Sequence, residues 1–272
     1  MKLRRRQVLL GLSGTAMLAG CGMLRPREQM SFVLVHGGWH GPWCWDKLAP
    51  LLRAEGHRVT SVDLQAGRPL AQSNLAAYVK QVTDALDAQG SPAVLVAHSS
   101  GGIAASQAAE ERPEKVRTLA FLTAFVAANG ESQRALQGAD PAQKVSPVLR
   151  VDFRPGTKIP YQTRIDTSNP EAVKLAFYND CTDADANAAI ARLVPEPIGP
   201  SGQPLRLTPE RFGRVAKAYI HCSRDNAISA GRQRQFAAKW PMRRIVTLDS
   251  SHAPFLSMPA RLAQALTAEI HA

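Results

Sequence analysis

A short apolar run that ends at a serine between small residues is the feature that most constrains this chain. Residues Ala93–Val96 read as a buried strand, Ala97–Gly101 follow directly, and Ile103–Ala109 have the composition of a helix. A strand that turns this sharply into a helix needs small residues two positions before and after the serine, Ser99, because the turn is tight and strained. Gly101 meets this requirement, and Ala97, where glycine is commoner, is also small. The pattern is typical of a nucleophile elbow.

Further apolar runs recur along the chain with helix-like segments between them. The runs predicted as strands are 32–35, 59–62, 93–96, 116–122, 218–222 and 245–248. Helical spacing of apolar residues is found at 45–55, 75–89, 103–111 and 259–270. Buried strands that alternate with helices indicate the α/β class, with a mostly parallel sheet and helices on both of its faces.

The alternation breaks between residues 125 and 212. Ten prolines lie in this stretch, and helix-like pieces remain only at 171–178 and 183–193. We interpret residues 125–212 as a helical cap subdomain inserted into a core formed by residues 31–124 and 213–272. A cap over the ends of the strands is where we expect substrate selectivity to reside.

The first 20 residues have the organisation of an export signal. A basic stretch at 1–6 precedes an apolar stretch at 8–18, and small residues then lead to Cys21, as in the bacterial lipobox. We expect residues 1–20 to be removed, Cys21 to be lipidated, and residues 21–30 to form a linker. The domain would then be anchored in a bacterial envelope and face the periplasm or the exterior. Arg5 and Arg6 also resemble a twin-arginine signal, and an amphipathic helix of the fold is the alternative interpretation.

Charge and length limit the possible partners. The formal net charge is +11, but four of the positive charges lie in the first 20 residues and the others are scattered. Without a basic stripe interleaved with aromatic residues, no nucleic-acid partner is expected. No run of 18 apolar residues exists, so we expect no helix that spans a membrane.

The cysteines do not have the spacing of a metal site. Cys44 and Cys222 lie in apolar contexts, where small core residues are expected. A disulfide between Cys181 and either of these two residues is left open. We expect no metal and no cofactor.

A serine hydroxyl is a weak nucleophile at neutral pH and needs a general base that is oriented by an acid. In a fold with a nucleophile elbow, the acid and then the histidine follow the serine along the chain. Asp225 comes after the predicted strand 218–222, and His252 comes after the strand 245–248. Asp249 is the alternative acid. A turn residue is the competing interpretation of Asp225, and a solvated loop residue that of His252.

Two backbone N–H groups must face the negative charge that develops on the substrate oxygen. One comes from the residue after the nucleophile, Ser100, and the other from the glycine-containing loop after the first strand, where Gly38 is the expected donor. His36 and His98, although near these residues, are interpreted as structural. Trp39 is a candidate for the wall of the substrate pocket, with core packing as the alternative.

Four blocks of the sequence resemble one known family. They are Phe32–Trp45, Gly56–Leu64, Phe177–Cys181 and Tyr219–Asp225, and they occur in the same order as in the plant methylesterase and hydroxynitrile lyase family and its bacterial relatives. The resemblance covers residues 31–270. It implies an α/β-hydrolase fold, a serine triad and an oxyanion hole at the residues named above.

Two departures from the family pattern bear on the reaction. The resemblance implies threonine at position 37 and lysine at position 253 in the lyases, where this chain has Gly37 and Ala253. Dehalogenases carry an aspartate at the position of Ser99. We therefore predict a hydrolase of small carboxylic esters that works through an acyl-enzyme. A lyase of the hydroxynitrile type and a non-catalytic binder of a small ligand are the alternatives, and action on amide, thioester or carbon–carbon bonds is left open.

Overall fold

The structure, a computed structural model, describes residues 28–69, 72–138 and 140–271. The predicted export signal, the lipidation site Cys21 and most of the predicted linker lie outside the described residues.

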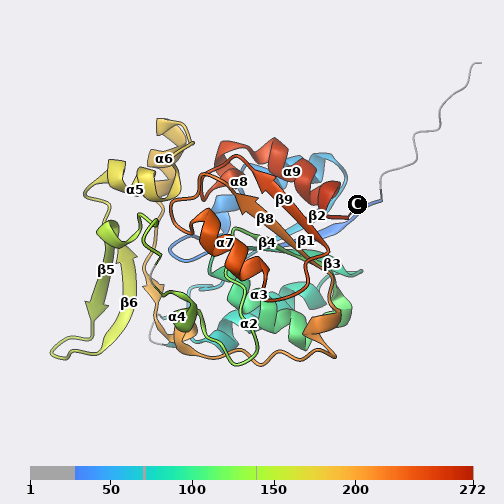
Figure 1. Ribbon diagram of the computed structural model, residues 1–272, viewed down its shortest axis with the longest axis horizontal. Coiled ribbons are helices and arrows are strands. Elements are labelled where there is room, and N and C mark those ends of the chain that lie inside the picture. Colours follow the sequence, from blue (N-terminus) through green and yellow to red (C-terminus); the bar gives the residue numbers. More distant parts are fainter. Residues whose placement is uncertain (1–27, 70–71, 139, 272) are drawn as a thin grey trace, which may run out of the picture.

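Six parallel strands form the central sheet (Figure 1). They are β1 (Ser31–Val35), β2 (Arg58–Val62), β3 (Ala93–His98), β4 (Val116–Leu122), β8 (Lys217–Cys222) and β9 (Arg244–Leu248). Their order is β2-β1-β3-β4-β8-β9, and every neighbouring pair is parallel. The predicted parallel α/β sheet is thereby confirmed, with each strand within two residues of its predicted bounds.

Side chains that alternate along the strands supply two cores, one on each face of the sheet. In β1, Phe32 and Leu34 join the core that contains helices α1 (Leu48–Ala54) and α9 (Pro259–Thr267). Val33 and Val35 join the other core, with the helices α2 (Leu75–Asp87), α3 (Gly101–Glu111) and α7 (Ala230–Ala237). The sheet is therefore buried on both faces, which explains its nearly continuous apolar strands.

Local sequence explains where the helices begin. The side chain of Asn74 accepts a hydrogen bond from the N–H of Ala77 and caps α2. Along α2, Leu75, Val79, Val82 and Leu86 recur at helical spacing and are buried. Helices α7 and α8 (Pro254–Ser257) were not predicted.

The connection between β4 and β8 is only partly helical. Its helices are α4 (Gln133–Leu136), α5 (Pro170–Phe177) and α6 (Asp183–Ile190), of which α5 and α6 were predicted. The strands β5 (Leu149–Phe153), β6 (Pro160–Ile165) and β7 (Glu196–Pro197) form an antiparallel sheet in the order β5-β6-β7. The expectation of a helical cap is therefore incomplete. The strands escaped prediction because they are only partly buried and lack a clean apolar alternation.

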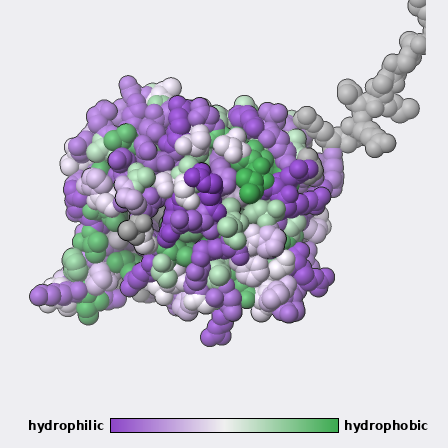
Figure 2. All heavy atoms as spheres, viewed as in Figure 1, coloured by the Kyte–Doolittle hydropathy of each residue, from purple (hydrophilic) through white to green (hydrophobic). Residues whose placement is uncertain are grey.

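The hairpin of β5 and β6 projects from the body of the molecule (Figure 1). Exposed apolar side chains of this hairpin are Val151, Phe153 and Ile159. Figure 2 shows hydrophobic surface at the lower left, where the hairpin lies in Figure 1. The last part of the connection, before β8, is buried instead: Leu205, Leu207 and Phe212 belong to the core that contains α3.

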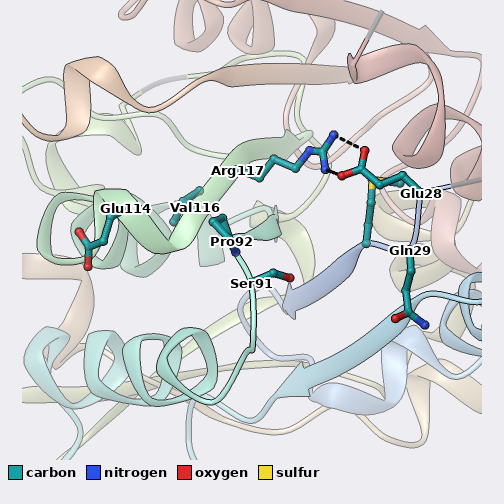
Figure 3. A pocket seen from close by; sticks show the side chains of 8 residues that line it. Glu28, Gln29, Ser91, Pro92, Glu114, Val116 and Arg117 are labelled. Atoms are coloured by element: carbon teal, nitrogen blue, oxygen red, sulfur yellow. Dashed lines mark hydrogen bonds and ion pairs between the residues drawn. The ribbon is translucent and has the colours of Figure 1, made fainter.

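The described chain starts beside the amino ends of the central strands. Arg117 at the start of β4 makes two hydrogen bonds to the carboxylate of Glu28, with N–O distances of 2.5 and 2.9 Å (Figure 3). The pair is exposed, so it contributes little to stability. The contact places residue 28 at the edge of the sheet where the parallel strands begin, whereas Ser99 lies at the edge where they end.

Cys44, Cys181 and Cys222 are buried and free, so neither of the disulfides left open by the sequence is formed. Burial raises the pKa of all three thiols, which keeps them protonated. Among the described residues, the structure contains no helix that is long and apolar enough to cross a bilayer.

Close packing at the start of α3 leads to a prediction about stability. A Cβ on Gly102 would lie 2.3 Å from the carbonyl oxygen of Phe125. We expect Gly102→Ala to lower the free energy of unfolding by about 1–3 kcal/mol in urea denaturation, in spite of the better helix propensity of alanine. Gly90→Ala is the control, because the atoms nearest to its Cβ belong to the flexible side chain of Arg58 at 3.6 Å. Equal stability of the two variants would contradict the packing argument.

Candidate active site

The site lies at the point of the sheet where successive strands are added on opposite sides of β1. From β1 the chain passes to β2 on one side and then returns to β3 on the other side of β1. Loops that leave the carboxyl ends of two such strands diverge, and they leave a crevice between them. The loop after β1 carries Gly37, Gly38 and Trp39, and the turn after β3 carries Ser99.

Ser99 has the strained backbone that the elbow requires. Its φ is +52°, in the left-handed region that residues with a Cβ rarely adopt. Its carbonyl accepts hydrogen bonds from the N–H groups of Gly102 (3.2 Å) and Phe125 (3.0 Å), which hold the turn in place. A Cβ on Gly101 would lie 2.4 Å from the carbonyl oxygen of His36, so the small residue predicted at this position is required.

His252 and Asp225 form a buried pair behind the serine. His252 Nδ1 lies 2.7 Å from Asp225 Oδ2, and the two residues are 2% and 5% exposed. Because a carboxylate only accepts hydrogen bonds, Nδ1 is the donor of this bond, and in the neutral imidazole Nε2 is the nitrogen that can accept a proton. Ser99 and His252 line the same cavity, so the structure brings the three predicted residues together at one site.

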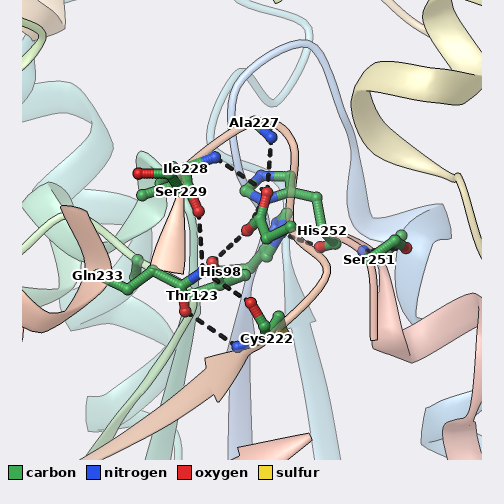
Figure 4. Close-up of polar contacts among 12 residues, drawn as sticks. His98, Thr123, Cys222, Ala227, Ile228, Ser229, Gln233, Ser251 and His252 are labelled. Atoms are coloured by element: carbon green, nitrogen blue, oxygen red, sulfur yellow. Dashed lines mark hydrogen bonds and ion pairs between the residues drawn. The ribbon is translucent and has the colours of Figure 1, made fainter. Parts of the chain in front are cut away.

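The carboxylate of Asp225 is held by three further donors (Figure 4). The N–H groups of Ala227 (2.6 Å) and Ile228 (2.9 Å) donate to Oδ1, and the hydroxyl of Thr123 donates to Oδ2. The alternative acid, Asp249, is exposed and bound to Ser223 and Arg224. Only Asp225 is therefore placed to orient the histidine.

Two residues that support this pair were missed in the sequence. Thr123 follows β4 with a φ of +38°, and nothing in the local sequence marks it as a partner of Asp225. Gln233, on α7, is fully buried and makes hydrogen bonds to the N–H and carbonyl of Cys222 and to the carbonyl of Ile228. It fixes both ends of the loop that carries Asp225.

The two predicted oxyanion-hole residues lie side by side at the cavity. Gly38 and Ser100 both line it, and a Cβ on Gly38 would lie 3.3 Å from Ser100 Oγ. At the preceding position, a Cβ on Gly37 would lie 2.7 Å from Ser99 Cβ and 2.9 Å from His98 Nδ1. The backbone of this loop therefore packs directly on the turn at Ser99, and no larger residue fits at position 37 without a shift.

The other histidines of the site are buried supports, as predicted for His36 and His98. His36 Nδ1 donates to the carbonyl of Gly37, and its Nε2 accepts from the N–H of Leu64 (3.1 Å). His98 Nε2 donates to the carbonyl of His252 (2.9 Å). Burial lowers the pKa of His36 and His98, so both stay neutral and add no charge beside His252.

His40, to which the sequence gave no role, supports the loop after β1 that carries Gly38. Its Nδ1 donates to the carbonyl of Gly38 (2.8 Å), and its Nε2 accepts from the hydroxyl of Tyr178 (2.8 Å). Burial lowers the pKa of His40 to about 3. The Tyr178–His40 chain therefore links the residue that follows α5 in the cap connection to the loop of Gly38.

The cavity in front of the serine has a volume of about 550 Å³. Its wall combines apolar side chains with a few polar ones, including Trp39, Phe177, Phe236, Gln133, Arg134 and Glu196. Trp39, the candidate for a pocket wall, is among the residues that line this cavity. Within the described residues, no three His, Cys, Asp or Glu side chains are grouped as ligands for a metal.

The order of the sheet and the serine on the turn after β3 place the protein among the α/β-hydrolases. It belongs to the Alpha/beta hydrolase family, whose sequence model matches residues 32–265. Methylesterase 7 of Arabidopsis thaliana is 31% identical, over 86% of this chain and 94% of its own length. Methylesterase 1 of the same plant is 29% identical, over 88% and 95%. A pyrethroid hydrolase from Sphingobium faniae has a similar structure, with a TM-score of 0.79 and 27% identity over 90% of this chain and 98% of its own.

The hydroxyl of Thr123 gives a prediction about the buried pair. Thr123→Val leaves one oxygen of the Asp225 carboxylate short of a donor, and we expect the free energy of unfolding at pH 7 to fall by about 1–3 kcal/mol in chemical denaturation. Thr123→Ser keeps a hydroxyl and should restore most of this loss. Thr118→Val, at a buried threonine within β4, is the control. If Thr123→Val were as stable as the control, the hydroxyl would not support Asp225.

Proposed function

We propose that this protein hydrolyses small carboxylic esters with Ser99 as the nucleophile, His252 as the general base and Asp225 as its orienting acid. The observation that carries the proposal is the buried Asp225–His252 pair, with Nδ1 and Oδ2 2.7 Å apart, at the same cavity as a serine with a φ of +52°. A strained serine, a histidine with a fixed tautomer and a pocket wide enough for a small molecule serve acyl transfer together.

In the first half of the proposed reaction, Ser99 Oγ attacks the ester carbonyl carbon while its proton passes to His252 Nε2. Asp225 stabilises the imidazolium that forms. The oxyanion accepts hydrogen bonds from the N–H groups of Gly38 and Ser100. When the tetrahedral intermediate collapses, the bond to the alcohol oxygen breaks, and that oxygen takes the proton from Nε2.

In the second half, water attacks the carbonyl carbon of the acyl-enzyme and gives a proton to His252 Nε2. The bond between the acyl carbon and Ser99 Oγ then breaks, and Oγ regains the proton from Nε2. The products are the alcohol and the carboxylic acid, and the protein returns to its starting state. No metal or cofactor takes part in these steps.

Two observations favour hydrolysis over the lyase alternative. The lyases that the sequence resembles have threonine at position 37, but in this chain a Cβ there would lie 2.7 Å from Ser99 Cβ. Position 253, a lysine in those lyases, is a buried alanine, so no ammonium stands beside His252 to hold a departing cyanide. The names of the relatives, methylesterases and a pyrethroid hydrolase, support ester substrates.

The test is covalent labelling with a fluorophosphonate, combined with kinetics on esters of graded acyl and alcohol size. Wild type should be labelled, and Ser99→Ala should lose labelling and at least about 10⁴-fold in kcat/KM. Ser168→Ala, an exposed serine of the cap connection, should behave as wild type.

Each competing function has its own outcome. Release of cyanide from cyanohydrins by unlabelled wild type would favour the lyase. Ligand binding that is equal in wild type and Ser99→Ala, with no turnover of any ester, would favour the non-catalytic binder. Either result would refute the proposed hydrolase.

We also propose that the protein is exported and anchored by a lipid on Cys21, which rests on the pattern of residues 1–21 alone. The described chain begins at the amino ends of the strands, and residues 21–27 span at most about 25 Å when extended. An anchor at Cys21 would then hold residue 28, and with it the amino ends of the strands, within about 25 Å of the membrane.

Expression in a bacterial host with labelled palmitate tests this proposal. Wild type should take up label and sediment with membranes, Cys21→Ser should lose the label, and Cys181→Ser should keep it. Unlabelled wild type in the cytosolic fraction, with residues 1–20 retained, would contradict export and anchoring.

A further inference from the structure

Glu196, on the short strand β7, is one of two acidic residues in the described part of the cap connection that line the cavity, and Asp140 is the other. Glu196 lies beside the loop after β1, because a Cβ on Gly38 would be 3.8 Å from Glu196 Cγ. The hydroxyl of Tyr78, on α2, donates to its Oε1 (3.2 Å), and the side-chain amide of Gln65, after β2, donates to its Oε2 (3.4 Å). The N–H of Trp39 also donates to Oε2 (3.4 Å).

Trp39 is held on three sides by the cap connection. Besides the bond from its N–H to Glu196, its carbonyl accepts from the N–H of Val194 (2.9 Å), and its indole Nε1 donates to the hydroxyl of Thr163 on β6 (3.1 Å). Its φ is +61°, a strained value for a residue with a side chain. Such a conformation persists only where the surroundings hold it, and here these three bonds do so.

The carboxylate of Glu196 has protein donors on both of its oxygens. Tyr78 serves Oε1, and Trp39 and Gln65 serve Oε2. This arrangement suits a group that holds the protein backbone in place better than one that binds substrate directly. Since Trp39 directly follows Gly38, any movement of the peptide unit that joins them also moves Gly38, whose N–H is the expected oxyanion donor.

We infer that Glu196 is a positioning residue: it ties the cap connection to the peptide unit of Trp39 and thereby aims the N–H of Gly38 at the oxyanion. This inference rests on the proposed hydrolase function. It makes the oxyanion hole a joint product of the core and the cap connection, assembled only when β7 is seated on the loops after β1 and β2.

The protonation state of Glu196 provides an independent observable. Burial raises the pKa of Glu196 to about 7, against the effect of its hydrogen bonds. Tyr78 is the titratable group in contact with it, and Asp63 and Arg68 act in turn on Tyr78. An ionised carboxylate accepts from all three donors, whereas a protonated one needs an acceptor for its own O–H. The bond to the Trp39 N–H should therefore be strongest above pH 7.

The kinetic test compares Glu196→Ala and Glu196→Gln with wild type on one ester. Loss of one oxyanion donor costs about 10²–10³ in kcat, so a donor that is only loosened should cost about tenfold. We expect Glu196→Ala to lower kcat about tenfold with little change in KM. Glu196→Gln, which keeps one acceptor oxygen, should regain part of the lost kcat. Glu171→Gln, an exposed residue of α5, is the matched control.

A rise in KM with unchanged kcat would overturn the inference, because Glu196 would then be a substrate ligand. Unchanged kinetics in Glu196→Ala would overturn it as well. A general loss of folding in that variant would be revealed by circular dichroism. Thr163→Val then provides the second kinetic test, with a smaller fall in kcat expected. It removes the indole bond of Trp39 and the longer bond from the Thr163 hydroxyl to the carbonyl of Glu196 (3.5 Å), and it leaves the Glu196 carboxylate in place.

A measurement without any substrate separates this inference from the proposed function. The backbone ¹⁵N–¹H resonance of Trp39 should titrate with a midpoint near pH 7 in wild type and lose that transition in Glu196→Gln. The result stands even if no ester is hydrolysed, in which case only the proposed function fails. A Trp39 resonance that titrates equally in both proteins would show that Glu196 does not hold this peptide unit.

Discussion

The tight turn at Ser99 is the constraint on which the rest of the site depends. Its left-handed backbone is held by close packing against the loop after β1 and the segment after β4. The packing is so close that a Cβ at Gly37, Gly101 or Gly102 would lie within 2.7 Å of a neighbouring atom. The same contacts bring the loop after β1 against Ser99. The packing that strains the serine therefore also places the expected oxyanion donors beside it, so strain and preorganisation have one origin.

Desolvation sets the electrostatics around this turn. Four histidines, His36, His40, His98 and His252, are buried close together, and only His252 has a carboxylate at hydrogen-bond distance. Burial lowers the pKa of the other three, which keeps them neutral and usable as plain hydrogen-bond partners of backbone groups. A charge that develops on His252 during a reaction is thus stabilised by Asp225 and is not opposed by other imidazolium groups.

The sequence predicted what depends on local pattern and on chain order. The six strands appear as apolar runs, and the order of Ser99, Asp225 and His252 follows from the ends of those strands. The supports of the site were not predictable, because each joins segments far apart in the chain. Thr123 meets Asp225 across 102 residues, and Trp39 meets Glu196 across 157. The β5–β6 hairpin was not predicted, because its half-exposed strands lack the apolar periodicity of a buried strand.

The most direct test of the proposed site is a crystal structure of the protein with a boronic acid, which adds reversibly to an activated serine and resembles the tetrahedral intermediate. We predict a bond from boron to Ser99 Oγ, with one boronate oxygen within about 3 Å of the N–H groups of both Gly38 and Ser100. A boronic acid that occupies the cavity without bonding to Ser99, or whose oxygen lies away from these two groups, would contradict the proposed roles of these residues.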